Sequence, residues 1–295
     1  MSARRKSGPV DGRGLLARNK WLLLRRSSQL FFLGLFLAGP VAGIWIVKGT
    51  LASSLTLGVL PLTDPYMLLQ GIFAGNLPAT TALAGAAIVL AVYALIGGRV
   101  YCSWVCPINI VTDASHWLSE RFGIPKGWQP KRSLRYWILG MTLAASAATG
   151  VIVWELVNPI TLLHRGLLYG AGLAWLAVPA VFLFDLFVSR RGWCGHICPV
   201  GAFYGLIGRF ALPRINAFAR SACDDCMDCY AVCPEPHVIT PALKGAKKGD
   251  GPLILSPDCS NCGRCIDVCD RIVFKISSRF AKTADDATLP QRKAA

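Results

Sequence analysis

The sequence predicts a two-part protein, a membrane bundle of four α-helices followed by a small α+β domain rich in cysteine. Of its 295 residues, 54% are hydrophobic and only 16% are charged, which is too apolar for an ordinary soluble domain. Four apolar stretches are long enough to cross a bilayer, which needs about 20 residues per helix. Eight of the twelve cysteines lie in one short C-terminal segment. Together these features favour a membrane protein that carries a small cofactor-binding domain.

The distribution of basic residues predicts the topology. The four apolar stretches are Ser28–Val47, Ala79–Gly97, Leu134–Val157 and Leu167–Val188. Of the 31 Lys and Arg residues, 29 lie before the first stretch, in the central loop and after the fourth stretch. The positive-inside rule therefore places both termini and the cysteine-rich domain in the cytoplasm. Because the basic residues follow this topology, the net charge of +15 does not indicate a nucleic-acid partner.

The C-terminal cysteines form two runs with the spacing C-x2-C-x2-C-x3-C, which bacterial ferredoxins use to hold [4Fe–4S] clusters. In two-cluster ferredoxins the fourth cysteine of each run binds the other cluster. We therefore assign one cluster to Cys223, Cys226, Cys229 and Cys269, and the other to Cys259, Cys262, Cys265 and Cys233. Zinc explains two complete runs in tandem poorly, and disulfides require an oxidising compartment. The C-terminal part is thus predicted to be a two-cluster ferredoxin-like domain.

The remaining four cysteines form a repeated C-x3-C-P motif. Cys102 and Cys106 follow the second apolar stretch, and Cys194 and Cys198 follow the fourth. Three interpretations remain open: the four thiolates converge on a further metal or cluster, each pair cycles between dithiol and disulfide, or they cap helix ends that face the ferredoxin-like domain. Their occurrence at equivalent places favours a functional role.

A second feature of the sequence is repeated with them. Asp64-Pro65 precedes Cys102, and Asn158-Pro159 precedes Cys194, at 37 and 35 positions from proline to cysteine. The membrane part is therefore predicted to be two helical hairpins in parallel repeat, a device known in other membrane proteins. Glu155 lies at the external end of the third stretch, where an ionisable group is a functional hypothesis by default, and we consider it a candidate proton acceptor.

These observations divide the chain into five segments: a basic cytoplasmic N-terminus (1–27), the four-helix membrane domain with both C-x3-C-P motifs (28–199), a connector (200–222), the ferredoxin-like domain (223–280) and a disordered tail (281–295). All four histidines lie outside the apolar cores, so the sequence does not indicate haem between the helices.

Four sequence segments carry a family resemblance: Pro61-Leu-Thr-Asp-Pro, Cys102-Ser-Trp-Val-Cys-Pro, Trp193-Cys-Gly-His-Ile-Cys-Pro and Cys229-Tyr-Ala-Val-Cys-Pro. In these segments the chain resembles the NapH family, ferredoxin-type membrane proteins of periplasmic nitrate reductase systems. The MauN family of methylamine utilisation is similar and is a close rival. The resemblance implies an electron-transfer component of the bacterial inner membrane that acts as a quinol dehydrogenase.

The implied partners are quinol, membrane lipid, a NapG-like periplasmic iron–sulfur protein and a membrane cytochrome c. On this interpretation the C-x3-C-P cysteines are catalytic and Glu155 accepts a proton from quinol. The clusters are predicted to lie in the cytoplasm whereas the implied acceptor is periplasmic, so the electron route is open. A MauN-like electron-transfer role and a maturation factor that supplies reducing equivalents or thiols to a periplasmic redox enzyme are the alternatives.

Overall fold

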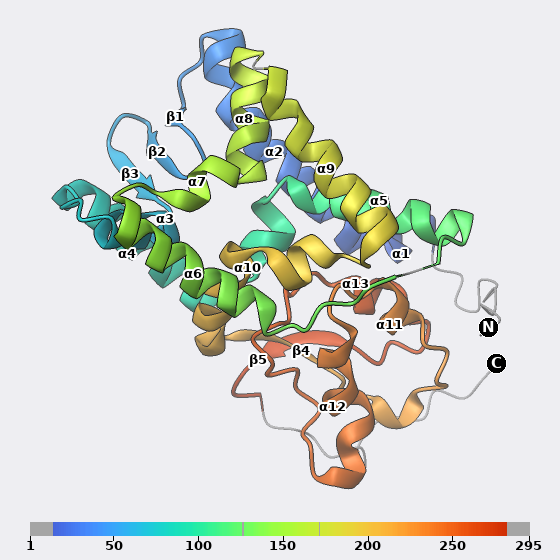
Figure 1. Ribbon diagram of the computed structural model, residues 1–295. Helices are drawn as coiled ribbons and strands as arrows, with labels where there is room; N and C mark the ends of the chain where they lie inside the picture. Colours follow the sequence, from blue (N-terminus) through green and yellow to red (C-terminus); the bar gives the residue numbers. More distant parts are fainter. Residues whose placement is uncertain (1–13, 126, 171, 282–295) are drawn as a thin grey trace.

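The computed structural model describes residues 14–125, 127–170 and 172–281. Its helical part, up to about residue 210, carries the cysteine-rich domain at one end (Figure 1). Two groups of helices diverge from that domain in Figure 1. One group contains α2 (Lys20–Ala42), α8 (Pro159–Tyr169) and α9 (Ala177–Leu183), and the other contains α3 (Pro65–Phe73), α4 (Thr80–Ile96) and α6 (Leu134–Thr149). Residues 1–13 of the segment 1–27 that was expected to be a basic terminus, and the tail after residue 281, lie outside the described residues.

The described part of the chain begins with a short helix, α1 (Leu15–Arg18), followed by α2 and a three-stranded antiparallel sheet that the sequence did not predict. Its strands are β1 (Val47–Gly49), β2 (Ser53–Thr56) and β3 (Leu60–Thr63), in the order β1-β2-β3. Val47 pairs with Thr56, and Ser53 pairs with Thr63. The sheet packs along α4, so the loop after α2 folds back along the helices.

The expected spans are only partly continuous helices. The first predicted span, Ser28–Val47, corresponds to helix α2, which begins earlier, at Lys20, and ends at Ala42. The last residue of that predicted span, Val47, belongs to strand β1 instead. The third stops at Thr149, because Gly150 adopts the left-handed conformation that ends helices, and α7 (Val153–Val157) is a separate turn. The fourth is broken by Gly170 and a 3₁₀ segment, η2 (Gly172–Leu176), before α9 and a π-helical turn, η3 (Phe184–Val188). Among the described residues, α2 alone is long and apolar enough to cross a membrane, a criterion that buried helices and signal sequences also meet. The four-span bundle is therefore not confirmed.

The two halves of the helical part begin in the same way. Asp64 is the N-cap of α3 and accepts a hydrogen bond from the Tyr66 amide at 3.0 Å. Asn158 is the N-cap of α8 and accepts one from the Ile160 amide at 3.1 Å. In both helices proline occupies the first position, where its missing N–H costs nothing. Asp64-Pro65 and Asn158-Pro159 therefore form equivalent helix caps.

The cysteine-rich domain is built around a two-stranded sheet. Its elements are η6 (Arg220–Ala222), α11 (Asp228–Val232), η7 (Pro236–Val238), α12 (Ile239–Lys244), η8 (Gly245–Lys248) and α13 (Arg264–Asp267), with β4 (Pro213–Asn216) and β5 (Lys275–Ser278). β4 pairs antiparallel with β5, with Ile215 opposite Ile276. The segment expected to be a connector, 200–222, therefore supplies helix α10 (Pro199–Ile207), a 3₁₀ turn η5 (Gly208–Phe210) and one strand of the domain's sheet.

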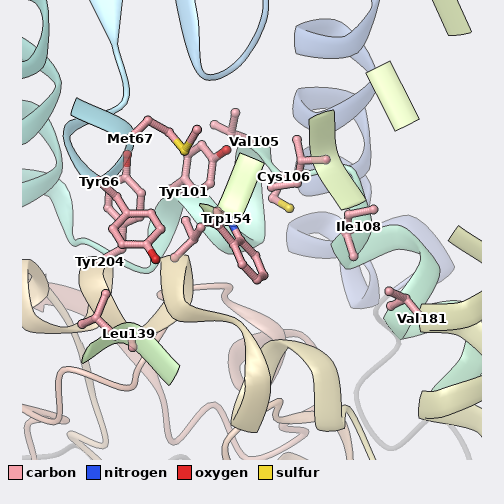
Figure 2. Close-up of a cluster of buried hydrophobic side chains, with 13 residues drawn as sticks. Tyr66, Met67, Tyr101, Val105, Cys106, Ile108, Leu139, Trp154, Val181 and Tyr204 are labelled. Atoms are coloured by element: carbon pink, nitrogen blue, oxygen red, sulfur yellow. The ribbon is translucent and has the colours of Figure 1, made fainter. Parts of the chain in front are cut away.

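The helical part has its own aromatic core at the junction with the domain. Figure 2 shows Tyr66, Tyr101, Tyr204 and Trp154 packed together, with Cys106 close by. Tyr101 and Tyr204 stack with ring centroids 4.8 Å apart. This core fixes the segments that carry the C-x3-C-P motifs.

Candidate metal centres

The two C-x3-C-P motifs have the same backbone. Each begins in a π-helical turn, η1 (Tyr101–Val105) and η4 (Trp193–Ile197), a conformation that occurs often at functional sites. The amide of Cys106 bonds to the carbonyl of Tyr101 at 3.0 Å, and that of Cys198 bonds to Trp193 at 2.9 Å. The second cysteine of each motif then turns to nearly identical extended angles, φ −65° and ψ 119° in one and φ −64° and ψ 113° in the other. The duplication seen in the sequence is a structural repeat.

These four cysteines line one cavity. Cys102, Cys106, Cys194 and Cys198 surround it together with Tyr101, Trp154, Asn158 and Trp193. The rings of Trp154 and Trp193 stack at 6.3 Å. The sequence left open whether the four thiols converge on a metal or cluster, and the shared cavity supports that interpretation.

Helix ends also face the cavity. The sulfur of Cys106 accepts hydrogen bonds from the amides of Ile108 and Asn109, at the start of α5 (Ile108–Phe122). The sulfur of Cys198 accepts them from Val200 and Gly201, in the first turn of α10. Amides at a helix N-terminus stabilise negative charge. The cysteines of the two C-x3-C-P motifs therefore converge on one cavity, and the second cysteine of each motif also lies at a helix N-terminus.

Burial raises the pKa of all four thiols, that of Cys198 to about 12. The guanidinium of Arg99 opposes this effect at Cys102, to which it donates a hydrogen bond. Metals bind the thiolate, so the positive charge of a bound metal would offset the cost of burying it. The indole Nε1 of Trp154, which is 3% exposed, has no hydrogen-bond partner in the described part of the chain. A buried donor without a partner and four thiols around one cavity fit a metal–sulfur group.

The two C-terminal runs also fold alike. Asp225 and Met227 in the first run have φ of 56° and 63°, and Asn261 and Gly263 in the second have φ of 47° and 71°. Each run thus makes the same left-handed turns between its first three cysteines. Because non-glycine residues rarely adopt this conformation, the match between the runs reflects a shared turn geometry.

The runs are interleaved in space. Cys233, from the end of the first run, lines a cavity with Cys259, Cys262 and Cys265 of the second. We call these four the inner set. Cys223, Cys226, Cys229 and Cys269 form the outer set, in which Cys226 is exposed and Cys229 lies within electrostatic range of the other three. The grouping is the one expected for crossed fourth ligands. In residues 14–125, 127–170 and 172–281, no three His, Cys, Asp or Glu side chains converge tightly enough for a single metal ion.

Buried ion pairs join the domain to the C-x3-C-P segments. Arg99 and Arg135 both bond to Glu235, and Arg135 also pairs with Asp258. At the other edge, Arg191 donates to the carbonyl of Val232 at 3.1 Å. Arg99 and Arg191 stand at the same place in the repeat, three residues before the first cysteine of each motif. These arginines do not stand out in the sequence, because a basic residue near a membrane boundary is expected on topology alone.

The N-terminal helix is bound to the domain as well. The carboxylate of Asp267 accepts hydrogen bonds from the amides of Trp21 and Leu22 at 3.1 Å each, so it caps the start of α2. The Trp21 ring lies against Gly263. Helix α2 thus begins on the surface of the domain that holds the inner set.

Glu155 is adjacent to the four-cysteine cavity without lining it. It is half-buried in α7, accepts a hydrogen bond from Thr161 at 3.1 Å and lies 3.7 Å from Arg165. Its neighbours Trp154 and Asn158 do line the cavity. The structure therefore places Glu155 beside the site, paired with a cation.

Comparison with known proteins defines the class. A family described as a 4Fe-4S binding domain matches residues 78–125 and 171–216, and one described as a 4Fe-4S dicluster domain matches residues 222–271. The first covers both C-x3-C-P motifs and the second covers both C-terminal runs. No solved structure matches the chain. The chain is a ferredoxin-type iron–sulfur protein.

The relatives narrow this class to a family. The chain is 57% identical to the methylamine utilization ferredoxin-type protein MauN of Paracoccus denitrificans, over 91% of this chain and 94% of the relative. It is 46% identical to the ferredoxin-type protein NapH of Escherichia coli, over 93% and 95%, and 24% identical to the putative electron transport protein YccM of the same organism, over 90% and 78%. The chain belongs to the family of ferredoxin-type proteins that includes NapH and MauN.

Proposed function

We propose that the protein is a membrane-bound electron-transfer component that takes electrons from quinol and passes them to a partner redox enzyme. The observation that carries this proposal is the arrangement of its twelve cysteines in three sets of four. The C-x3-C-P set lies at the base of the helices, the inner set adjoins it through buried arginines, and the outer set reaches the surface. Such a series suits one-electron transfer between a membrane-dissolved donor and an external partner.

Exposed apolar side chains support a membrane location. On α2, Leu30 and Phe31 are 58% and 62% exposed, and on α4, Leu90 and Leu95 are also exposed. Large exposed apolar surfaces mark sites of interaction with lipid or protein. The segregation of Lys and Arg into three segments adds to this, so we propose a multi-pass protein of the bacterial inner membrane with its iron–sulfur domain in the cytoplasm.

We assign the cluster ligands as the sequence predicted, with one [4Fe–4S] cluster on the inner set and one on the outer set. The C-x3-C-P cysteines would hold a further cluster. A cluster there would supply a one-electron carrier next to the helices. The protein's contribution is to direct helix N-termini and Arg99 at the thiolates and to exclude water with the Trp154–Trp193 pair.

Oxidation of quinol to quinone releases two electrons and two protons, so the site must also accept protons. We propose Glu155 for this role because it lies within one turn of Asn158, at the edge of the cavity. Thr161 and Arg165 hold its carboxylate in place. Substitution Glu155→Gln removes the acceptor and keeps the size of the side chain, so it is expected to slow quinol oxidation with iron content unchanged.

The family suggests two alternative electron acceptors, one in methylamine utilisation and one in periplasmic nitrate reduction. The identities to the MauN relatives, 57% and 52%, exceed those to the NapH relatives, 46% and 47%. This favours methylamine utilisation as the first system to test. In the NapH-like version, electrons pass with a NapG-like periplasmic iron–sulfur protein and a membrane cytochrome c toward nitrate reductase. Complementation of strains that lack one or the other relative distinguishes the two.

The experiment that tests the function is anaerobic purification followed by addition of a reduced quinol analogue. Cluster reduction is read by electron paramagnetic resonance, and iron and sulfide are counted on the same sample. Two cubane clusters bring about eight irons and three bring about twelve. Reduced-cluster signals and about twelve irons are the expected result, with the count falling to about eight in a Cys102→Ser/Cys194→Ser double variant.

Clusters that dithionite reduces and quinol does not would overturn the quinol dehydrogenase role and turn attention to a maturation factor. A count of about eight irons in the unsubstituted protein would overturn the third cluster alone. A double variant that still passes electrons to the partner would remove the C-x3-C-P cysteines from the route.

A further inference from the structure

Arg99 contacts both C-x3-C-P segments and the iron–sulfur domain. It is 4% exposed and lies three residues before Cys102, to whose sulfur it donates a hydrogen bond. One terminal nitrogen donates to the carbonyl of Cys194 at 3.3 Å. The other donates to Glu235 Oε1 and to the carbonyl of Asp258, each at 2.9 Å. A single guanidinium therefore spans the two repeats and the domain.

Arg135 makes a parallel connection from the first turn of α6. It is 1% exposed and donates to the carbonyl of Gly195, inside the second C-x3-C-P motif, at 3.2 Å. Its other terminal nitrogen pairs with Asp258, and His237 contacts the second oxygen of that carboxylate at 3.0 Å. Burial raises the pKa of Asp258, but His237 and Arg135 outweigh it and hold that pKa below the usual range. Asp258 is therefore a fixed negative charge.

The acids that hold these arginines lie beside the inner set. Glu235 and Asp258 line the same cavity as the four inner cysteines. Glu235 is two residues after Cys233, and Asp258 directly precedes Cys259. Arg99 therefore connects the carbonyl of Cys194 to the carbonyl of Asp258, the residue directly before the inner-set ligand Cys259. The two guanidinium groups lie between one four-cysteine cavity and the next.

Buried ion pairs of this kind are poor sources of stability, because desolvation costs as much as the pairing returns. Their position gives them an electrostatic role. A reduced iron–sulfur cluster carries one more negative charge than the oxidised form, so a nearby buried cation stabilises the reduced state and raises the potential. Low local dielectric makes that effect larger than at the surface.

We propose that Arg99 and Arg135 are positioning residues that raise the redox potentials of the centres at the C-x3-C-P cysteines and at the inner set, and thereby define the electron route between them. This inference rests on the proposed function for its direction of electron flow. Its electrostatic content does not depend on which donor supplies the electrons.

The test compares Arg99→Gln and Arg135→Gln in the full chain, purified anaerobically and titrated against redox mediators with dithionite while the clusters are followed by electron paramagnetic resonance. We expect the potentials of the C-x3-C-P and inner centres to fall. A tenfold change in the reduction equilibrium corresponds to about 59 mV for a one-electron centre, and a fall of about that size or more is the expected result. The outer set, farther from both arginines, keeps its potential.

Arg132→Gln is the matched control. Arg132 bonds to the same Glu235 at 3.2 Å, but its side chain is 44% exposed, so solvent screens its charge. Its removal should leave the potentials in place. An equal shift in Arg132→Gln, or no shift in the buried variants at full iron content, would overturn the proposal.

Loss of iron in the glutamine variants would indicate that they fold poorly. The Arg99→Lys variant then tests whether the charge at this position sets the potential. Lysine keeps the charge and loses the forked geometry, so the inner potential should stay near that of the unsubstituted protein. A potential in Arg99→Lys as low as expected for a neutral side chain would contradict an electrostatic role. Failure of quinol to reduce the clusters would remove the proposed function and leave the dithionite titration valid.

Discussion

The hydroxyl of Tyr204 donates a hydrogen bond to Asp64 Oδ1 over 3.2 Å. This bond ties the helix that follows the second C-x3-C-P motif to the Asp-Pro cap of the first repeat. Asp64 is 9% exposed, and no described Lys or Arg side chain forms an ion pair with it. Burial raises its pKa from 3.8 to about 6, although hydrogen bonds from Tyr66 and Tyr204 oppose the shift. Asp64 is thus a buried acid at the junction of the two repeats.

Asp64→Asn should stabilise the protein at neutral pH. A carboxyl whose pKa is raised by folding binds its proton more tightly in the folded state, so stability falls as pH rises from about 4 to about 6 and stays lower above that. Asparagine keeps the cap, as Asn158 does at the equivalent place. The gain at pH 7.5 is expected to reach up to about 3 kcal/mol, from a shift of about two pKa units, and to vanish near pH 4. Thermal unfolding in detergent at several pH values measures it.

The reverse substitution is the control. Asn158→Asp places a carboxyl in a cap that is 6% exposed, so it should lower the unfolding midpoint at pH 7.5 and recover toward pH 4. An Asp64→Asn variant that is less stable than the unsubstituted protein at pH 7.5 would show that the charge is stabilised by something other than these contacts.

Much of the site was predictable from the spacing of cysteines, because ligand spacing and turn geometry are local. The grouping of Cys233 with the second run was expected from cysteine spacing, and the equivalence of Asp64-Pro65 with Asn158-Pro159 was visible in the sequence, although their role as helix caps was not. The continuity of the helices could not be predicted from the sequence. Apolar composition alone cannot show that Gly150 and Gly170 end helices, nor that an apolar stretch continues into a β-strand.

The pairing of Arg99 with Glu235 was equally invisible in the sequence. These residues are 136 positions apart, and each has an ordinary explanation where it stands. Only the docking of the domain on the helices brings them together. Long-range ion pairs depend on tertiary arrangement, whereas helix N-caps and cysteine runs are encoded within a few residues.

Cys233→Ser should disturb the cluster of the second run, because Cys233 lies with Cys259, Cys262 and Cys265 around one cavity. Cys269→Ser should disturb the cluster of the first run. Serine is a poorer iron ligand than thiolate, so each variant is expected to lose or alter one cluster of about four irons and keep the other. Electron paramagnetic resonance of the two single variants, compared with a Cys259→Ser variant, measures this. Cys233→Ser should match Cys259→Ser, and a match to Cys223→Ser instead would contradict crossed ligands.

Gly263→Ala should detach the N-terminal helix from the domain. A Cβ at this position would lie 2.4 Å from the Trp21 ring, and φ is +71°. Steric overlap and the left-handed backbone together are expected to cost about 2–4 kcal/mol. The unfolding midpoint and the tryptophan fluorescence of the folded protein report the change.

Met227 provides the matched control for Gly263. It has the same left-handed backbone in the first run, with φ of +63°, and its side chain is 48% exposed. Met227→Ala should change stability by no more than about 0.5 kcal/mol. Met227 already carries a Cβ in the left-handed region, so Met227→Ala adds neither backbone strain nor overlap with a ring. A Gly263→Ala variant as stable as Met227→Ala would show that neither contact with Trp21 nor the left-handed backbone restricts position 263.

Asp113→Asn should strongly destabilise the protein, because Asp113 is the shared partner of three arginines. Asp113 pairs with Arg191 at 2.9 Å, with Arg25 at 3.2 Å and with Arg26, and Arg25 is 1% exposed. Burial raises the pKa of Asp113, but the three arginines outweigh it and lower that pKa. Removing the charge leaves the buried Arg25 without its counter-charge, although Ser103 and Asn109 still accept hydrogen bonds from it, and breaking a buried ion pair costs about 3–5 kcal/mol.

The pH dependence of Asp113 has the opposite sign to that of Asp64. A carboxyl with a lowered pKa contributes stability that is present above its unfolded pKa near 4 and is lost as pH falls toward its folded pKa. The destabilisation of Asp113→Asn should therefore be full at pH 7 and shrink in acid. Asp225→Asn is the control, since Asp225 pairs with Lys244 at 2.8 Å but is 67% exposed, and such surface pairs contribute little. Thermal unfolding at pH 7 that ranks the two variants equally would show that burial of the arginines is not what makes Asp113 important.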